Sequence, residues 1–357
     1  MSRFLLLFSQ VVVLFLSARA SSEVKEPTCR NNDGYNVCHY NGVLVEVTTS
    51  NRSSKNRFED RLNLWNLNLW NLDLLEIREG AFTNVSATHL YLNQGNRISV
   101  LKRESFRGLP NLKYLYVDGN VVPLSGYLFA DLRHLQLLLL GSNGINSIPK
   151  DTFAGLSSLG ILSLERNDIE AIETERFSNL PTLSMLWLNS NKISRVAPGS
   201  FAGLTELRRL YLDYNRLEDL SSGAFRGLNK LEDLYLNDNR ITSVSRSLLR
   251  DLVGLKRLYL QQNEISVLEP GTFQELSQLE LLRLHRNKLS HIVVGTFAGL
   301  SNLKDIMLSN NNIQTVDIGT FADLVKLRHL YFDGYFGDNF TEIRKELSGL
   351  PYFKFYP

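Results

Sequence analysis

The sequence predicts a single α/β solenoid of about eleven to twelve stacked turns, with a parallel β-sheet along one face. The first observation is a segment, Leu183 to Leu204, whose pattern returns 24 residues later and then repeats through most of the chain. The second is an asparagine column: Asn120, Asn143, Asn167, Asn191, Asn215, Asn239, Asn263, Asn287 and Asn311. The third is a phenylalanine column: Phe82, Phe106, Phe129, Phe153, Phe177, Phe201, Phe225, Phe273, Phe297 and Phe321. All steps are 24 residues, apart from one of 23 in each column and one turn in which Leu249 replaces phenylalanine.

Residues 1–20 have the pattern of a secretory signal peptide that is removed from the mature protein. Arg3 supplies a positive charge, the run from Phe4 to Leu16 is nearly all apolar, and residues 18–20 form a small-x-small cleavage site. A membrane anchor is the alternative, but this run is shorter than the roughly 20 apolar residues that span a bilayer. No later stretch is a transmembrane candidate, so we expect a freely secreted, extracellular protein without membrane insertion.

The mature chain is close to electrical neutrality. Cleavage after residue 20 removes Arg3 and Arg19, which lowers the number of Lys and Arg from 39 to 37, against 37 Asp and Glu. A neutral chain has no overall attraction for polyanions. We therefore expect no nucleic acid and no anionic membrane among its partners, although a local charged patch remains possible.

Residues 21–63 are predicted to form an N-terminal cap. Cys29 and Cys38, with eight residues between them, are expected to form a disulfide in an oxidising compartment. A metal site is disfavoured because only His39 lies nearby to complete a ligand set. The run from Val43 to Val47 predicts a strand that could pair with the strand of the first repeat, covering a turn that has no outer neighbour.

Residues 64–334 are predicted to be the repeats. In each L-x-L segment the two leucines point inward and the residue between them points outward, so Leu186 and Leu188 are core positions and Trp187 is exposed. Buried asparagine amides are expected to satisfy backbone groups of neighbouring turns, and the phenylalanine rings to form a spine on the crossover side. The second repeat, which gains a residue before Asn96, should be locally irregular.

Residues 335–357 break the pattern and are predicted to form a C-terminal cap without cysteines. Thr341 to Leu347 predicts a short helix with Thr341 as a possible N-cap. The run from Gly349 to Phe355 imitates the start of another turn. We expect it to add one last aromatic strand that closes the core.

The repeat L-x-x-L-x-L-x-x-N-x-I/L-x-x-I/L/V-x-x-x-x-F-x-x-L resembles the extracellular leucine-rich repeat family, in its typical 24-residue subfamily, over about residues 64–332. Toll-like ectodomains and other animal leucine-rich repeat proteins share this pattern. The resemblance implies a right-handed horseshoe with the sheet on its concave face. The chain departs from the family in having two cysteines rather than four in the N-terminal cap and no C-terminal cysteine cap.

The sequence contains no motif of an enzyme or of a cofactor site. It has no G-x-S-x-G, no H-E-x-x-H and no Gly-rich phosphate loop. The spacing of its six histidines matches no metal motif, and His285 and Arg286 are interpreted as surface residues at the ends of strands. We predict a protein that is not an enzyme and that binds no cofactor and no metal.

The outward positions of the sheet carry the candidate binding residues. The position inside each L-x-L reads Tyr91, Tyr116, Leu139, Ser163, Trp187, Tyr211, Tyr235, Tyr259, Arg283, Met307 and Tyr331. The outward position before it includes Met185, Arg209, Asp233 and Arg257, and the position after it includes Glu165, Asp213, Gln261 and His285. Exposed Trp, Tyr, Arg and Met with a polar frame are typical of a protein-binding hot spot.

Ten of these residues form the predicted protein-binding site. They are Tyr116, Met185, Trp187, Arg209, Tyr211, Asp233, Tyr235, Arg257, Tyr259 and Arg283. The alternative stays open, because tyrosine is common at this slot in the family, where the flat rings of neighbouring turns stack on each other. Trp187, Leu139 and Met307 depart from that habit and favour an interface.

Three N-x-S/T sequences are candidate glycosylation sites: Asn51, Asn84 and Asn339. None of them lies on a predicted strand of the sheet. Sugars at these positions would leave the sheet face open to a partner.

Two function hypotheses follow. The first is a secreted recognition protein that binds an extracellular protein ligand through the concave sheet, in innate immunity or in adhesion and signalling, the settings that the resemblance suggests. The second is a non-catalytic accessory or inhibitory subunit that holds a secreted enzyme. The sequence identifies neither the ligand nor the oligomeric state.

Overall fold

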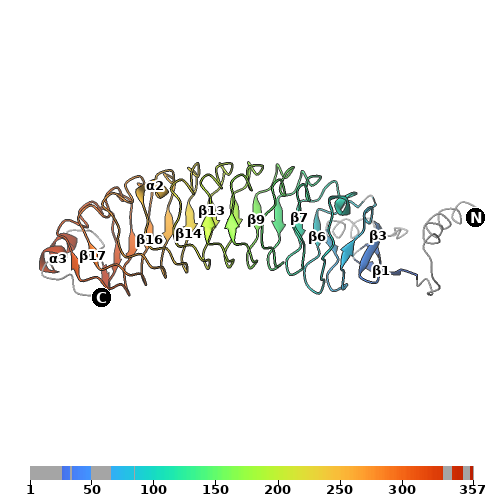
Figure 1. The fold of residues 1–357 in the computed structure, drawn as a ribbon, viewed down its shortest axis with the longest axis horizontal. Coiled ribbons are helices and arrows are strands. Elements are labelled where there is room, and N and C mark those ends of the chain that lie inside the picture. Colours follow the sequence, from blue (N-terminus) through green and yellow to red (C-terminus); the bar gives the residue numbers. More distant parts are fainter. Residues whose placement is uncertain are drawn as a thin grey trace, which may run out of the picture.

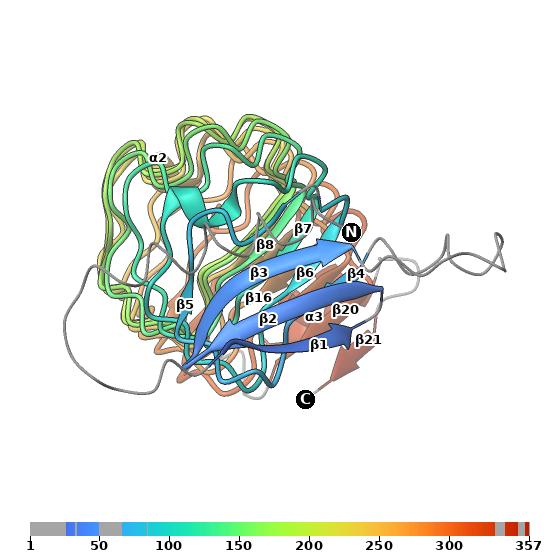
Figure 2. The same ribbon diagram turned by 90° about the vertical axis from the view of Figure 1, so that its right-hand side faces the viewer.

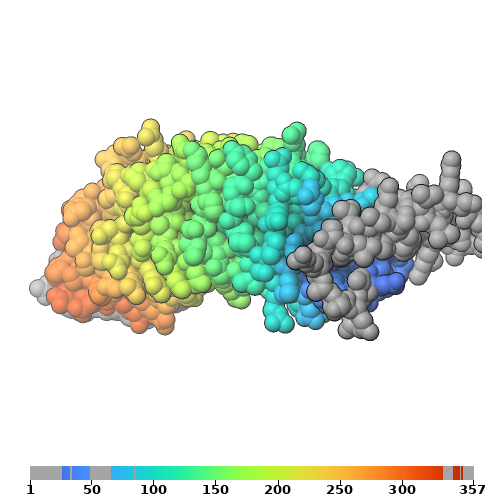
Figure 3. Space-filling view, turned by 45° about the vertical axis from the view of Figure 1, so that its right-hand side comes forward, coloured from blue at the N-terminus to red at the C-terminus, as the bar shows by residue number. Residues whose placement is uncertain are grey.

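The computed structural model describes residues 26–32, 34–49, 66–83, 85–332, 340–348 and 354–356. In them the turns stack along one long, gently curved axis (Figure 1). In the space-filling view the colours follow one another along this axis in sequence order, so each turn lies against its sequence neighbours (Figure 3). The predicted solenoid is confirmed.

A 13-stranded parallel sheet runs along one side of the solenoid. In spatial order from the N-terminal end, its strands are β4 (Asn66–Asn68), β6 (His89–Tyr91), β7 (Tyr114–Tyr116), β8 (Leu137–Leu139), β9 (Ile161–Ser163), β11 (Met185–Trp187), β13 (Arg209–Tyr211), β14 (Asp233–Tyr235), β15 (Arg257–Tyr259), β16 (Leu281–Arg283), β18 (Asp305–Met307), β20 (His329–Tyr331) and β21 (Lys354–Tyr356). Spatial order follows chain order. Equivalent residues of successive turns therefore lie side by side, as Trp187 does with Tyr211.

The crossovers occupy the other side of each turn and contain little regular structure. Seen along the stack, strands and crossovers lie on opposite sides of one ring (Figure 2). The short elements of the crossovers are η1 (Arg103–Phe106), β10 (Ala171–Ile172), β12 (Arg195–Val196), α2 (Arg246–Leu249), β17 (His291–Ile292) and β19 (Thr315–Val316). A narrow crossover lets the turns stack closely behind the sheet.

The core lies between the two sides. Leu186 and Leu188 are fully buried, as the alternation along a strand requires. The phenylalanine column forms the predicted spine, in which Phe177 and Phe201 stack with centroids 6.0 Å apart and Phe201 and Phe225 with centroids 6.3 Å apart. Buried Leu249, at the end of α2, occupies the slot between Phe225 and Phe273.

The asparagine column links each turn to the one before it. The Nδ2 of Asn215 donates to the backbone oxygens of Leu188 and Leu212, both at 3.0 Å, and its Oδ1 accepts from the backbone N–H of Ile193 at 3.0 Å. The same arrangement recurs at Asn191. The predicted role of the buried amides is therefore confirmed.

The second repeat is irregular in the way its extra residue predicts. Asn96 donates to the oxygen of Leu92, four residues earlier, whereas regular turns use the residue three positions earlier. Gly95, with φ of +66°, lies against Asn71 of the first turn, where a Cβ would come within 2.1 Å of the Asn71 Oδ1. Glycine accommodates both the conformation and the close approach.

The N-terminal cap is an antiparallel set of strands, β1 (Thr28–Asn32), β2 (Tyr35–Tyr40) and β3 (Val43–Thr49). The predicted disulfide between Cys29 and Cys38 joins β1 to β2. The predicted strand is present, but its suggested pairing with the first repeat's strand is wrong, because β3 pairs with β5 (Glu76–Ile77) rather than with β4. Buried Leu44 and Val47 of β3 cover the crossover side of the first turn instead of extending the main sheet.

At the other end, α3 (Phe340–Ser348) and β21 close the stack. The helix begins at Phe340, so Thr341 lies inside its first turn and is not the N-cap. Ile343 and Leu347, four residues apart on one helix face, are buried. The parallel pairing of β21 with β20 confirms the expected last strand.

Several expectations fall outside the described residues. They concern the signal sequence of residues 1–20, the glycosylation sites Asn51, Asn84 and Asn339, and the boundaries at 63/64 and 334/335. Within the described part of the chain, no helix combines the length and apolar character that a membrane span needs.

Candidate functional site

The outward side chains of the main sheet form the candidate site, here called the sheet face. Each strand from β4 to β20 in this sheet places its middle leucine or isoleucine in the core, so its first and third residues point outward. The third residues form the centre row, which includes Trp187, Tyr211, Tyr235 and Tyr259. The first residues form the strand-start row, and the residues two positions after the centre row form the strand-end row.

The middle of the centre row is a continuous stack of half-buried rings. Tyr235 lies between Tyr211 and Tyr259, with centroids 4.3 Å and 4.4 Å away and interplanar angles of 8° and 6°. Trp187 meets Tyr211 edge-on, at 6.2 Å and 77°, so its indole does not continue the flat stack. Arg283 lies over the other end, its Cζ 5.2 Å from the Tyr259 centroid, at cation–π distance.

The tyrosine rings shield one another from water. Burial raises the pKa of Tyr235 far above its ordinary value, and the neighbouring Tyr259 and Tyr211 add to the rise. The Tyr235 phenol is therefore neutral at physiological pH. The three tyrosines offer a partner hydroxyl groups above a flat apolar surface, which is an arrangement typical of aromatic anchors.

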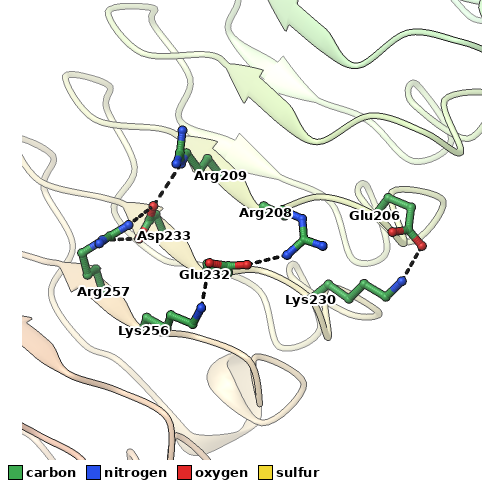
Figure 4. A network of polar contacts seen from close by, with 8 residues as sticks. All are labelled: Glu206, Arg208, Arg209, Lys230, Glu232, Asp233, Lys256 and Arg257. Carbon is green, nitrogen blue, oxygen red and sulfur yellow. Dashed lines mark hydrogen bonds and ion pairs between the residues drawn. The ribbon is translucent and has the colours of Figure 1, made fainter.

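An arginine pair flanks the stack in the strand-start row. Asp233 is only 1% exposed, and it accepts hydrogen bonds from Arg209 Nε at 3.2 Å and from Arg257 Nη2 at 2.7 Å (Figure 4). The hydrogen bonds to Asp233 raise the pKa of Arg257. Asp233 thus holds two guanidinium groups in place and presents almost none of its own surface to a partner, whereas Arg209 is exposed.

The flank beside the strand starts carries a second ladder of charges. Glu232 accepts from Arg208 and Lys256, at 2.5 Å and 2.9 Å, and Lys230 reaches Glu206 at 2.5 Å (Figure 4). Each of these pairs joins neighbouring turns. Opposite charges spaced by one repeat therefore neutralise this flank, although exposed pairs of this kind add little stability.

The strand-end row has a different character. Asp118, Glu165 and Asp213 follow strands β7, β9 and β13, and Asp238 lies beside them after β14. Burial raises the pKa of Asp213 to about 6, and the charges of Asp238 and Glu165 add to the rise. Burial also raises the pKa of Asp118. Asp118 and Asp213 each keep one buried carboxylate oxygen, Oδ1, without a hydrogen-bond partner.

His285 lies in the strand-end row near Arg283. Burial lowers the pKa of its imidazole, and the charges of Arg283 and Arg286 lower it further. Its buried Nδ1 has no hydrogen-bond partner among the described residues. In the described ranges, no group of three or more His, Cys, Asp or Glu residues is arranged to hold a metal ion.

The structure brings nine of the ten predicted residues together on strands β11 to β16, and it places Tyr116 apart. Tyr116 stacks on Tyr91 at 4.4 Å, and Leu139 and Ser163 of β8 and β9 separate it from Trp187. The list of ten omitted Asp118 and Asp213. The acidic residue is visible in the repeat pattern, but its burial and its lack of a partner are not.

Three comparisons with known proteins bear on this geometry. A family model described as "Leucine rich repeat" matches residues 63–122, 133–193, 158–217, 181–241, 230–289 and 277–334. No curated protein sequence matches the chain. Among solved structures, the TLR13–ssRNA13 complex superposes with a TM-score of 0.71 at 28% identity, over 76% of this chain and 39% of the TLR13 chain. This chain therefore spans about two fifths of that protein.

Two bacterial structures are also similar. A leucine-rich repeat protein of Leptospira interrogans has a TM-score of 0.60 at 25% identity, over 75% of this chain and 72% of that chain. An internalin of Listeria monocytogenes, inlF, has a TM-score of 0.56 at 21% identity, over 87% of this chain and 89% of that chain. The internalin likeness concerns the fold alone.

Proposed function

Since the chain belongs to the leucine-rich repeat family, we propose that it is a secreted, non-enzymatic recognition protein that binds an extracellular protein through its sheet face. Proteins of this family typically bind other proteins, and their fold is typically non-catalytic. The observation that carries the proposal is the row formed by Trp187, the tyrosine stack and Arg283. Large aromatic and arginine side chains held rigidly at the centre of a surface are the usual anchors of an interface.

Pre-organisation adds to the case. Tyr235 is held between two rings, and Asp233 fixes Arg209 and Arg257 before any partner arrives. A side chain already held in one conformation loses little conformational entropy on binding. The middle strands, β11 to β16, therefore present a surface suited to tight contact.

Secretion has two supports. Residues 1–20 carry the pattern of a signal peptide, and Cys29 and Cys38 form a disulfide of the kind that persists in oxidising compartments. Innate immunity and extracellular adhesion or signalling are the settings we propose. The similarity to TLR13, which was solved in complex with ssRNA13, supports a recognition role without identifying the partner.

The test begins with affinity capture from the extracellular fluid of the source, followed by mass spectrometry and binding measurements with the captured protein. Tyr211→Ala combined with Tyr235→Ala removes the centre of the aromatic stack. We expect this double change to abolish binding while the melting temperature falls by only a few degrees. The matched control is Tyr127→Ala, because Tyr127 is an exposed tyrosine outside the sheet strands. Binding that survives the double change would rule out the sheet face.

The same capture distinguishes the second hypothesis, an accessory or inhibitory subunit of a secreted enzyme. That role requires a single stoichiometric enzyme partner. TLR13 was solved with ssRNA13, so a single-stranded RNA belongs in the same assay. We expect no RNA binding at the sheet face, because the unpaired carboxylates of the strand-end row repel phosphates.

A further inference from the structure

The strand-end row contrasts with the charged positions elsewhere on the repeats. Elsewhere on the turns, carboxylates meet a cation from a neighbouring turn, as in Glu206–Lys230, Glu264–Lys288 and Glu280–Lys304. The described residues supply no such ion pair to Asp118, Glu165 or Asp213. Their only recorded side-chain partners are neutral: Asn93 bonds to Asp118 at 3.4 Å, and Asn189 bonds to Glu165 at 3.3 Å.

Burial makes this arrangement costly. A carboxylate oxygen removed from water without a donor loses hydration that nothing in the protein replaces. Asp118 Oδ1 and Asp213 Oδ1 are both in this state. Glu165 and Asp238 surround Asp213 with further negative charge, as its raised pKa reflects. The described residues give these two oxygens no compensating donor.

The row adjoins the aromatic stack directly. Asp213 lies two residues after Tyr211 on the same turn, and Asn189 and Asn237 occupy the corresponding positions beside Trp187 and Tyr235. A partner that covers the rings also covers these oxygens. Strands are about 4.8 Å apart, so the row from β7 to β14 spans about 24 Å. That length matches an extended protein segment of about eight residues.

Resting on the proposed function, we propose that the strand-end row is the specificity-determining part of the interface, and that it takes a partner segment carrying lysine or arginine side chains alongside the aromatic stack. A cation placed there would give the unpaired oxygens their missing donors. It would also relieve the repulsion among Asp213, Glu165 and Asp238. An acidic partner or a nucleic acid would be repelled by these carboxylates.

The test uses labelled peptides of about ten residues, long enough to span the row. One alternates Lys and Ser, a second alternates Glu and Ser, and a third probe is a single-stranded RNA of matching length. We expect the Lys peptide alone to bind, with an affinity that falls as salt is added. Asp213→Asn should weaken its binding about tenfold or more, because the change removes one partner of a largely desolvated charge pair. Equal binding by the Glu peptide or by the RNA would overturn the proposal.

The matched control is Glu264→Gln, which removes the same charge from a carboxylate outside the strand-end row that is paired with Lys288. This variant should bind the Lys peptide as the unchanged protein does. Asp213→Asn should also leave the melting temperature unchanged or raise it, because it removes a poorly solvated charge. Loss of binding accompanied by a lower melting temperature, or an equal loss in Glu264→Gln, would contradict a role specific to the row.

The pH dependence of binding of the Lys peptide gives a second measurement. Glu165, Asp238 and the Tyr214 hydroxyl are the titratable groups that act on Asp213, and lysine keeps its charge throughout the relevant range. A cation binds the ionised form of Asp213, so affinity should fall as the pH is lowered through about 6, its pKa in the free protein. Asp213→Asn should remove that part of the pH dependence. An unchanged pH profile in this variant would count against the assignment.

The binding measurements also distinguish the role of the strand-end row from the proposed function of the sheet face. A captured partner that is lost with the Tyr211 and Tyr235 changes but binds Asp213→Asn normally would refute the strand-end row and leave the sheet-face function standing. Binding that is insensitive to all these changes would refute both.

Discussion

Asn215 shows how one residue type holds this fold together. Its amide makes three hydrogen bonds of 3.0 Å, one within its own turn and two to the turn before. The bonded groups are backbone atoms left over where the chain turns away from the sheet. Because a buried amide both donates and accepts, no hydroxyl or carboxylate could satisfy all three. The column is therefore structural.

Asn215→Ala should lower the free energy of unfolding by about 1–3 kcal/mol, since the buried N–H of Ile193 loses its partner, while the oxygens of Leu188 and Leu212 keep only the amides of Asn191 and Asn239. Urea denaturation followed by circular dichroism measures the change. Asn189→Ala is the control, because that half-buried amide makes one 3.3 Å bond to Glu165 and its loss should cost less than about 0.5 kcal/mol. Equal effects of the two changes would contradict the structural role of the column.

The sequence predicts the role of a residue correctly where that role follows from its position in the repeat. The roles of Asn215 and Phe201 follow from their spacing alone. Asp213 differs, because the printed sequence shows an acidic residue in an ordinary outward position. Its pKa of about 6 depends on burial by neighbouring turns and on charges at Asp238 and Glu165, and these are properties of the stack.

Single elements are too short to be stable alone. The strands of the main sheet have three residues each, such as Met185–Trp187, and the helix α2 has four. Each element gains its stability from the turns on either side. The phenylalanine spine is the clearest case, with stacked centroids 5.8–6.5 Å apart over much of its length.

Phe201→Ala should cost about 3–5 kcal/mol, because it removes a fully buried ring from between Phe177 and Phe225. Phe201→Leu should cost far less, about 1 kcal/mol, since Leu249 already fills one slot of the column. Chemical denaturation of both variants gives the comparison. A leucine variant as unstable as the alanine variant would show that ring stacking outweighs the filling of volume.

Elements that repeat were predicted well, and those at the ends less well. The register of strands such as β11 and β13 follows from the leucine spacing. The pairing of β3 does not, because Val43 to Val47 has two possible neighbours, β4 and β5, and the choice depends on which apolar surface of the first turn needs cover. The helix α3 likewise starts at Phe340 and not after Thr341.

The whole molecule is a stack of nearly equivalent turns, so it should tolerate loss of one turn. Deletion of residues 229–252 removes 24 residues and brings Phe225 next to Phe273 in the spine. We expect this variant to fold, with unchanged circular dichroism per residue and a shorter maximum dimension in small-angle scattering. Deletion of residues 229–240 is the control, because half a turn breaks the register of both columns and should prevent folding. Equal folding of the two variants would contradict the repeat model.

The candidate site is formed by several turns together. The sequence predicted which side chains face outward, because alternation along a strand decides it. The order of side chains along the sheet also placed Leu139 and Ser163 between Tyr116 and Trp187. The sequence did not predict that Arg209 and Arg257 would cover Asp233, because that depends on contacts between neighbouring turns.

The hydrogen bonds between neighbouring turns also determine how the molecule would respond to tension. The strands β4 and β21 lie at opposite ends of the sheet, whose hydrogen bonds run along the stacking axis. A force applied between the two ends would therefore act on the hydrogen bonds of one three-residue strand at a time. The turns would be released one after another from an end of the sheet. Each released turn would lengthen the chain by about 80 Å. When pulled at its two ends, the protein would extend in nearly equal steps at low force, one step for each turn.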